Sequence, residues 1–151
     1  MKINKTIEKS GFYGDLIFSS EFWEFYLAPN QTYLGTGVLL LKRHCEGLRY
    51  IEKEEWEDFN ELVKAIELGL LDTFNITLFN WASASNLTFR DNNDNPKPQV
   101  HWHIHPRYEN PVTFDGVKFV DENFGYMPTT ESKDISDDIR HKIIETIRTH
   151  F

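Results

Sequence analysis

The chain has 151 residues and a formal net charge of −8; 40% of its residues are hydrophobic and 26% are charged. This length and composition are typical of one soluble globular domain, which we expect to comprise residues 1–151. The acidic balance argues against a nucleic-acid coat protein or a membrane-surface protein, because either would need a basic face.

Two strands and a long helix are predicted in the first half of the chain. Residues 22–27 are dense in aromatic side chains and precede turn residues at 29–31, which is typical of a strand. Residues 38–42 form a continuous apolar run that suits a central, buried strand. Apolar spacings of three and four then predict a helix over 52–71. The apolar stripe of this helix comprises Trp56, Phe59, Val63, Ile66 and Leu70.

The second half of the chain predicts further strands, a hairpin and a final helix. Residues 74–81 are typical of a strand, and the segment 86–98, rich in Asn and Asp, is expected to be a loop. A hairpin is expected over 112–119 around an Asp-Gly pair. A helix is expected from Ser136 onward, where isoleucines recur every four residues. Consecutive strands in this order can pair antiparallel, so the predicted class is α+β.

The most informative segment is a row of histidines within residues 99–107. These histidines alternate with bulky apolar residues, and successive side chains of a strand point to opposite faces of the sheet. One face would carry polar side chains about 7 Å apart, so such a row can surround one phosphoryl group or one metal ion. The polar face comprises Gln99, His101, His103 and His105, and the apolar face comprises Val100, Trp102 and Ile104.

Three interpretations of this row compete. The simplest is a strand whose histidines are partly exposed and bind nothing. The second is a metal site, because neutral imidazoles are good metal ligands and the spacing of His103, His105 and Glu109 matches half of a cupin-like motif. At the upstream position where this motif requires a glycine, this chain has Lys97, and no second motif follows. The third is a row that holds a phosphate chain while one histidine attacks phosphorus.

The third interpretation agrees with a resemblance to a known family. The alternating histidines, closing with Pro-Arg at 106–107, resemble the signature of the histidine triad (HIT) superfamily of nucleotide hydrolases and transferases. Upstream, an apolar strand followed by Lys-Arg-His at 42–44 is similar to another segment of that family. The resemblance covers residues 17–125 and leaves 126–151 as a C-terminal extension with a helix. It implies a HIT-like antiparallel sheet of about five strands, a long helix and a C-terminal helix.

The register of the row decides which histidine is the nucleophile. A literal match places His101, His103 and His105 on the triad and makes His103 the nucleophile, but the Pro-Arg pair then occupies hydrophobic positions. Matching the Pro-Arg pair instead shifts the frame by two residues. Gln99 then replaces the first histidine, His101 becomes the middle one and His103 the third. We favour His101, with His103 as the alternative.

The resemblance implies covalent catalysis by the middle histidine. It would attack the α-phosphorus of a nucleotide in line and form a nucleotidyl-histidine intermediate, which water then hydrolyses. A neutral imidazole suits this role, because one nitrogen can attack while a hydrogen bond orients the other. The expected catalytic residues are His101 and His103, and the expected substrate-binding residues are His44, Gln99, Asn80, Asn86, His105 and Arg107. Some of these assignments have competing interpretations. The two asparagines suit a turn or cap role, His44 suits a surface position after a strand, and Arg107 suits a surface charge at the strand end.

The same resemblance implies a nucleotide as the small-molecule partner and pairing into a homodimer. We expect no nucleic-acid or membrane partner, no dedicated metal and no cofactor; a divalent cation would arrive only with a polyphosphate substrate. The single cysteine, Cys45, and the absence of a signal-like apolar run in 1–15 favour the cytoplasm. Two alternatives stay open: a nucleotide-binding protein made catalytically weak by Gln99, and a metal-dependent cupin-like enzyme.

Overall fold

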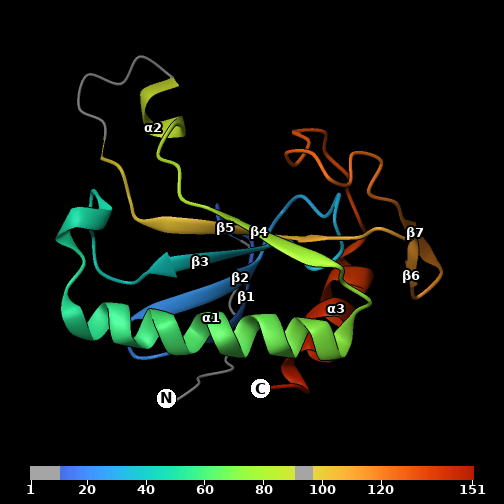
Figure 1. Ribbon diagram of the computed structural model, residues 1–151, viewed down its shortest axis with the longest axis horizontal. Coiled ribbons are helices and arrows are strands. Elements are labelled where there is room, and N and C mark those ends of the chain that lie inside the picture. The colour runs from blue at the N-terminus through green and yellow to red at the C-terminus, as the bar shows by residue number, and fades with distance from the viewer. Residues whose placement is uncertain (1–10, 91–96) are drawn as a thin grey trace.

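The computed structural model describes residues 11–90 and 97–151, which contain a five-stranded antiparallel sheet and a separate two-stranded hairpin (Figure 1). The predicted α+β class is confirmed. No helix in these described ranges is both long and apolar enough to cross a bilayer. The strands are β1 (Asp15–Ser19), β2 (Trp23–Leu27), β3 (Gly37–Leu41), β4 (Leu78–Ala82), β5 (His101–Arg107), β6 (Val112–Phe114) and β7 (Val117–Phe119). The helices are α1 (Lys53–Thr73), α2 (Leu87–Arg90) and α3 (Asp137–Arg148), with a 3-10 turn at Leu48–Tyr50.

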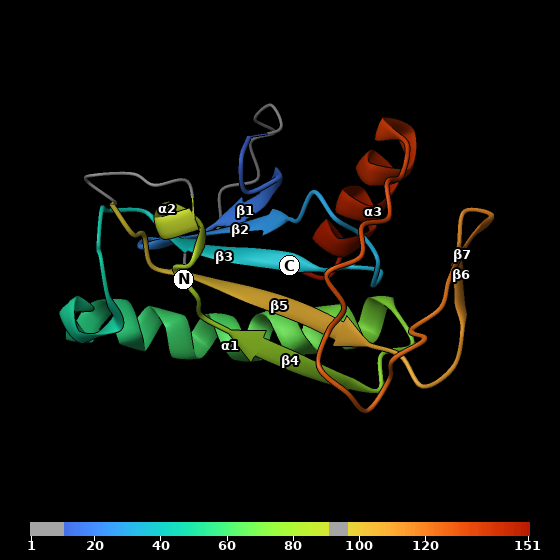
Figure 2. The same cartoon turned by 90° about the horizontal axis from the view of Figure 1, so that it is seen from above.

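The sheet has the strand order β1-β2-β3-β5-β4, and all neighbouring strands are antiparallel (Figure 2). Strand β3 is central and almost entirely buried, as its apolar run predicts. Helices α1 and α3 lie below the sheet in Figure 1, whereas α2 and the segment after β7 rise above it. Strand β5 runs between β3 and β4, so its upper face opens between those two raised segments.

The long helix α1 packs on the sheet through a line that differs slightly from the predicted stripe. Ile66 and Leu70 are fully buried as expected. Trp56 is 36% exposed, however, and Leu62 is fully buried in the core instead. The difference arises because α1 packs against α3 as well as against the sheet, which turns the buried line of the helix toward both neighbours.

Three elements differ from the sequence-based expectation. Strand β1 was not predicted, because its apolar centre is only three residues long and follows a polar N-terminal region. Strand β4 begins at Leu78, four residues after the expected start. Helix α2 lies inside the segment 86–98 that we expect to be a loop, and residues 91–96 of that segment lie outside the described residues.

The C-terminal helix and the hairpin form where the sequence predicts them. The Ser136 hydroxyl accepts a hydrogen bond from the Ile139 backbone N–H and so caps α3. Asp115 and Gly116 both have positive φ angles, of 46° and 80°, which suit the tight turn of a two-residue hairpin.

Two buried arginines fasten α3 to the first two strands. Arg148 donates hydrogen bonds to the backbone carbonyls of Leu16 and Ile17 in β1. Arg140 donates to the Leu27 carbonyl at the end of β2 and forms an ion pair with Asp15 at 2.6 Å. These bonds satisfy carbonyl oxygens on the edge strand β1 and at the end of β2, and they fix the C-terminal extension to the core.

The end of β5 is held by Arg107, whose side chain is only 1% exposed. All five N–H donors of its guanidinium are bonded, at distances of 2.6–3.0 Å. The acceptors are both carboxylate oxygens of Asp121, the side-chain oxygen of Asn80 and the backbone carbonyls of Asn123 and Tyr126. Both sequence-based interpretations of Arg107 are therefore wrong: it is neither a surface charge nor available to bind phosphate, because its donors are used inside the protein.

We expect Arg107→Met to lower the free energy of unfolding by about 3–5 kcal/mol, because it leaves the Asp121 carboxylate buried without a cation. Urea denaturation followed by circular dichroism measures this loss. The matched control is Lys142→Met, which removes exposed ion pairs to Asp115 and Asp138 and is expected to leave the midpoint nearly unchanged. Equal stability of Arg107→Met and the wild type would contradict the role given to Arg107.

Candidate functional site

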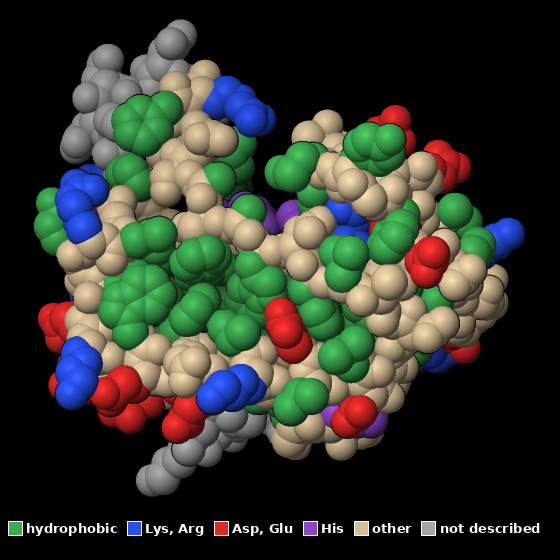
Figure 3. Space-filling model, in the orientation of Figure 1, with side chains coloured by type: hydrophobic (Ala, Val, Ile, Leu, Met, Phe, Trp, Pro, Cys, Tyr) green, Lys and Arg blue, Asp and Glu red, His purple; other side chains and the backbone are tan. Residues whose placement is uncertain are grey.

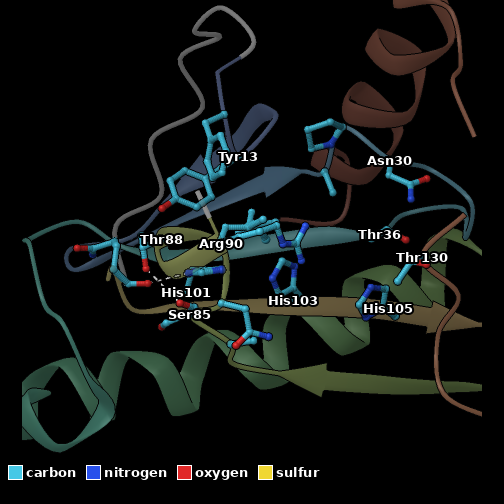
Figure 4. A pocket seen from close by; sticks show the side chains of 18 of the residues that line it. Tyr13, Asn30, Thr36, Ser85, Thr88, Arg90, His101, His103, His105 and Thr130 are labelled. Atoms are coloured by element: carbon cyan, nitrogen blue, oxygen red, sulfur yellow. Dashed lines mark hydrogen bonds between the residues drawn. The ribbon is translucent and has the colours of Figure 1, made fainter. Parts of the chain in front are cut away.

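The three histidines of β5 lie side by side on the floor of a cavity of about 580 Å³ (Figure 4). The ring centroids of His101 and His103 are 4.9 Å apart, edge to face. Those of His103 and His105 are 6.2 Å apart, with the rings nearly parallel. On the opposite face of the strand, the Trp102 ring packs 5.3 Å from Phe59 of α1, as the alternation predicts.

The cavity is walled by segments that are far apart in the sequence. One wall comes from residues 84–88, 90 and 97–99, and the other from 28–30, 32–33 and 129–130. Tyr13 lies over the row, with its ring centroid 5.5 Å from that of His101 (Figure 4). In the space-filling view the cavity is a hollow between two raised lobes, with histidine side chains visible at its base (Figure 3).

The charge in the cavity is unevenly distributed. Among the described residues, its cationic lining side chains are Arg90 and Lys97. Arg90 lies at the His101 end of the row, whereas Thr36 and Thr130 lie at the His105 end (Figure 4). The His101 end is therefore the part of the cavity that favours an anion.

His101 is oriented by a backbone hydrogen bond. Its Nδ1 lies 2.7 Å from the carbonyl oxygen of Gln99. A carbonyl can only accept, so in the neutral form of this ring the proton lies on Nδ1 and the lone pair lies on Nε2. This arrangement gives His101 a defined tautomer with a nucleophilic Nε2.

His103 and His105 are neutral at pH 7 because their pKa values are lowered. Burial lowers the pKa of His103, and the neighbouring His101 lowers it further. Burial also lowers the pKa of His105 to about 4, with smaller contributions from His103 and Arg107. The Nδ1 atom of His105 is itself buried and has no hydrogen-bond partner among the described residues.

Gln99 lines the cavity, but its side-chain amide is committed to the backbone. The amide nitrogen donates to the carbonyls of Leu41 and Arg43, and the amide oxygen accepts from the Cys45 N–H. These three bonds tie the chain after β3 to the start of β5. A histidine could not reproduce them, because a neutral imidazole has one donor and one acceptor.

Two of the expected substrate-binding residues lie elsewhere. The side chain of His44 is 57% exposed, lies 3.6 Å from Glu46 and does not line the cavity, because it follows the turn away from β3. Asn80 projects from β4 toward Arg107, and its side-chain oxygen accepts a hydrogen bond from the Arg107 guanidinium. Asn80 does not line the cavity either. Of the two predicted asparagines, Asn86 alone lines the cavity.

Several cavity residues were missed by sequence reasoning. They include Tyr13, Thr36, Arg90 and Thr130, which belong to four separate segments. Isolated threonines, tyrosines and arginines carry no motif, so no pattern in the sequence could have grouped them. Lys97 could have been found from its position two residues before the histidine row.

The donor set that the cupin-like alternative requires is not assembled in the cavity. In the ranges that the structure describes, no group of three or more His, Cys, Asp or Glu side chains is placed to hold a metal ion. Glu109, which that alternative needs near His103, is exposed and does not line the cavity.

Comparisons with known proteins identify the fold. No family model matches the sequence, and no curated protein matches it. A histidine triad protein from Sinorhizobium meliloti 1021 superposes with a TM-score of 0.70 at 12% identity, covering 90% of this chain and 88% of that one. A histidine triad protein from Marinobacter aquaeolei VT8 gives a TM-score of 0.63 at 15% identity, with 89% and 86% coverage.

A third solved structure agrees with these two. It is a hypothetical histidine triad nucleotide-binding protein from Sulfolobus tokodaii strain7, with a TM-score of 0.59, 16% identity and coverage of 89% of this chain and 81% of that one. At sequence identities this low, the superpositions show the fold and nothing more: the chain has the antiparallel α+β fold of the histidine triad proteins. The fold that the sequence resemblance implies is confirmed.

We expect the wild-type protein to lose stability as the pH falls from about 6.5 to about 4. Over this range His105 takes up a proton in the unfolded chain but stays neutral in the folded protein, so protonation favours the unfolded state. His105→Leu removes this difference, so its free energy of unfolding should fall less steeply over the same range. Urea titrations at several pH values measure both slopes. Parallel curves for the two proteins would contradict the neutral state of folded His105.

Proposed function

We propose that this chain, which has the fold of the histidine triad proteins, is a nucleotide hydrolase or nucleotidyl transferase that cleaves at the α-phosphate of a nucleotide conjugate. The nucleophile in this proposal is His101. One observation carries it: Nδ1 of His101 bonds to the Gln99 carbonyl at 2.7 Å while the ring lines the cavity. In covalent catalysis by an imidazole, one nitrogen attacks while a hydrogen bond to the other nitrogen orients the ring.

The proposed reaction has two displacements at phosphorus. Nε2 of His101 attacks in line, so that a P–N bond forms while the bond to the leaving group breaks and that group takes its electron pair and a solvent proton. Water then attacks the same phosphorus, loses a proton and displaces His101 with its lone pair restored. In a transferase, an acceptor hydroxyl takes the place of water.

The surroundings of His101 suit the charge that develops on the phosphoryl oxygens. His103 is neutral, so one of its nitrogens carries a proton that can be donated to a non-bridging oxygen. Arg90 and Lys97 supply positive charge from the cavity wall. We propose no resident cofactor: a divalent cation would enter only with a polyphosphate. Because Cys45 is a buried free thiol, we propose that the protein works in the cytoplasm.

Gln99 supports one alternative, a nucleotide-binding protein with weak or no turnover. Its amide cannot carry a proton between substrate and solvent near neutral pH, and all three of its bonds go to the backbone. Binding would then persist while the chemical step is slow. Activity measurements separate this alternative from the enzyme.

We expect His101→Ala to lower turnover by at least about 1,000-fold, because the covalent route is lost. His103→Ala is expected to cost about 100-fold, since it removes one donor to the phosphoryl group. The measurement is a hydrolysis screen over dinucleoside polyphosphates, nucleoside phosphoramidates and adenylylated compounds, followed by quenched-flow trapping of labelled nucleotide on the protein. Acid-labile label should appear on the wild type and be absent from His101→Ala.

His44→Ala serves as the matched control, because its exposed imidazole lies outside the cavity and turnover should be retained. Label that persists in His101→Ala but disappears in His103→Ala would establish the literal register of the row. Nucleotide binding without turnover on any substrate class would favour the weak-binding alternative.

We also propose that the chain forms a homodimer through α1 and β4. Strand β4 is an edge of the sheet, and apolar side chains gather over α1 and β4 in the view of Figure 3. Trp56, Leu71 and Leu78 on these two elements are each 36–44% exposed. An exposed strand edge beside apolar side chains is a surface that a second copy can cover.

We expect the double variant Leu71→Glu/Leu78→Glu to be monomeric under conditions in which the wild type is dimeric, because two carboxylates would be buried in the contact. Size-exclusion chromatography with light scattering measures the mass. The control Met127→Glu changes a side chain that is 80% exposed elsewhere and should leave the mass unchanged. A monomeric wild type at high concentration would reject the dimer.

A further inference from the structure

The surroundings of two histidines in the same row favour opposite tautomers. In His101 the proton lies on Nδ1, which faces the Gln99 carbonyl at 2.7 Å. In His105 the Nδ1 atom is buried and has no partner in the described part of the chain. A proton on that atom would be a buried donor without an acceptor, which is costly, so the proton of the neutral ring lies on Nε2. Since His105 lines the cavity, Nε2–H is the group that it presents to a ligand.

The position of His105 separates it from the reacting phosphorus. Its ring centroid lies 6.2 Å from that of His103, on the side of His103 away from His101 (Figure 4). A phosphoryl group attached to His101 would contact His103 first. The donor on His105 therefore meets the next part of the ligand, beyond the α-phosphate.

The surroundings of His105 favour an uncharged partner. Its neighbours in the cavity include Tyr33, edge-on at 6.2 Å, and the hydroxyl-bearing residues Thr36 and Thr130. The nearby cation, Arg107, is already neutralised by the carboxylate of Asp121. The cationic lining residue in view at the other end of the row is Arg90. An anionic leaving group suits that other end, and an uncharged group suits this one.

We propose that His105 is a specificity-determining residue that donates its Nε2–H to an uncharged hydrogen-bond acceptor on the nucleoside part of the nucleotide. The acceptor is a sugar oxygen or a base nitrogen or carbonyl. This inference rests on the proposed function and adds the orientation of the substrate in the cavity. The nucleoside lies toward Thr36 and Thr130, and the leaving group lies toward Arg90. An apolar residue at position 105, which the histidine triad pattern would place there, could not make this bond.

The test compares His105→Leu, which removes the donor, with His105→Gln, which restores a neutral donor. The probes are the four ribonucleoside monophosphates, ribose 5-phosphate and inorganic phosphate, with dissociation constants measured by calorimetry. We expect His105→Leu to weaken nucleoside monophosphate binding about tenfold and leave inorganic phosphate unchanged. His105→Gln should recover much of the loss, and His141→Leu, an exposed histidine on α3, should change nothing.

The probes also identify the acceptor. A loss that extends to ribose 5-phosphate assigns the bond to the sugar, whereas a loss confined to particular nucleoside monophosphates assigns it to the base. An equal loss on inorganic phosphate would make His105 a phosphate contact and overturn the proposal. If the wild type binds nucleoside monophosphates and His105→Leu binds them equally well, this inference alone is overturned. If the wild type binds no nucleoside monophosphate, the proposed function is overturned as well.

A second measurement needs no variant. Long-range proton–nitrogen NMR correlations distinguish the two tautomers of each histidine in the wild-type protein. We expect a protonated Nε2 on His105 and a protonated Nδ1 on His101, and a shift of the His105 signals when a nucleoside monophosphate is added but not when phosphate is added. A protonated Nδ1 on His105 would overturn the proposal.

Discussion

The shape of the cavity depends on one buried interaction, the hydrogen bonding of the Arg107 guanidinium. Arg107 follows the three histidines on the same face of β5 and so ends their row. Its bonds to Asp121 and to nearby carbonyls hold the segment after β7 against the sheet, and the guanidinium lies 4.8 Å from the centre of the Tyr33 ring. That segment continues to Thr129 and Thr130, which form part of the cavity wall. The hydrogen bonds of this arginine therefore hold one wall of the cavity in place, and its charge is not available to a ligand.

The histidine row shows how one residue type acquires different chemistry from its neighbours. His101 has a carbonyl acceptor for Nδ1, which leaves a lone pair on Nε2. His105 has no acceptor there, which favours the opposite tautomer. Burial keeps His103 and His105 neutral, so these two histidines can act as neutral donors to a phosphoryl group beside the nucleophile. The fixed cations come from the wall instead.

Much of the fold could be predicted, because its signals are local. The apolar run of β3, the Asp-Gly turn and the Ser136 cap each act within a few residues of themselves. Strand β1 could not be predicted, since its short apolar centre is stabilised by pairing with β2 and by Arg148 from the far end of the chain. The buried line of α1 shifted for a similar reason, because α3 packs beside it.

The sequence by itself determined that three histidines share one face of a strand and that the opposite face packs into the core, because alternation in a strand is a local geometric rule. The tertiary structure alone decided which polar residues join that row. In the folded protein His44 and Asn80 lie outside the cavity, and Arg107 forms an ion pair with Asp121. Tyr13, from the N-terminal region, lines the cavity. A cavity wall is made of side chains that meet only when distant segments pack, so their grouping leaves no pattern along the chain.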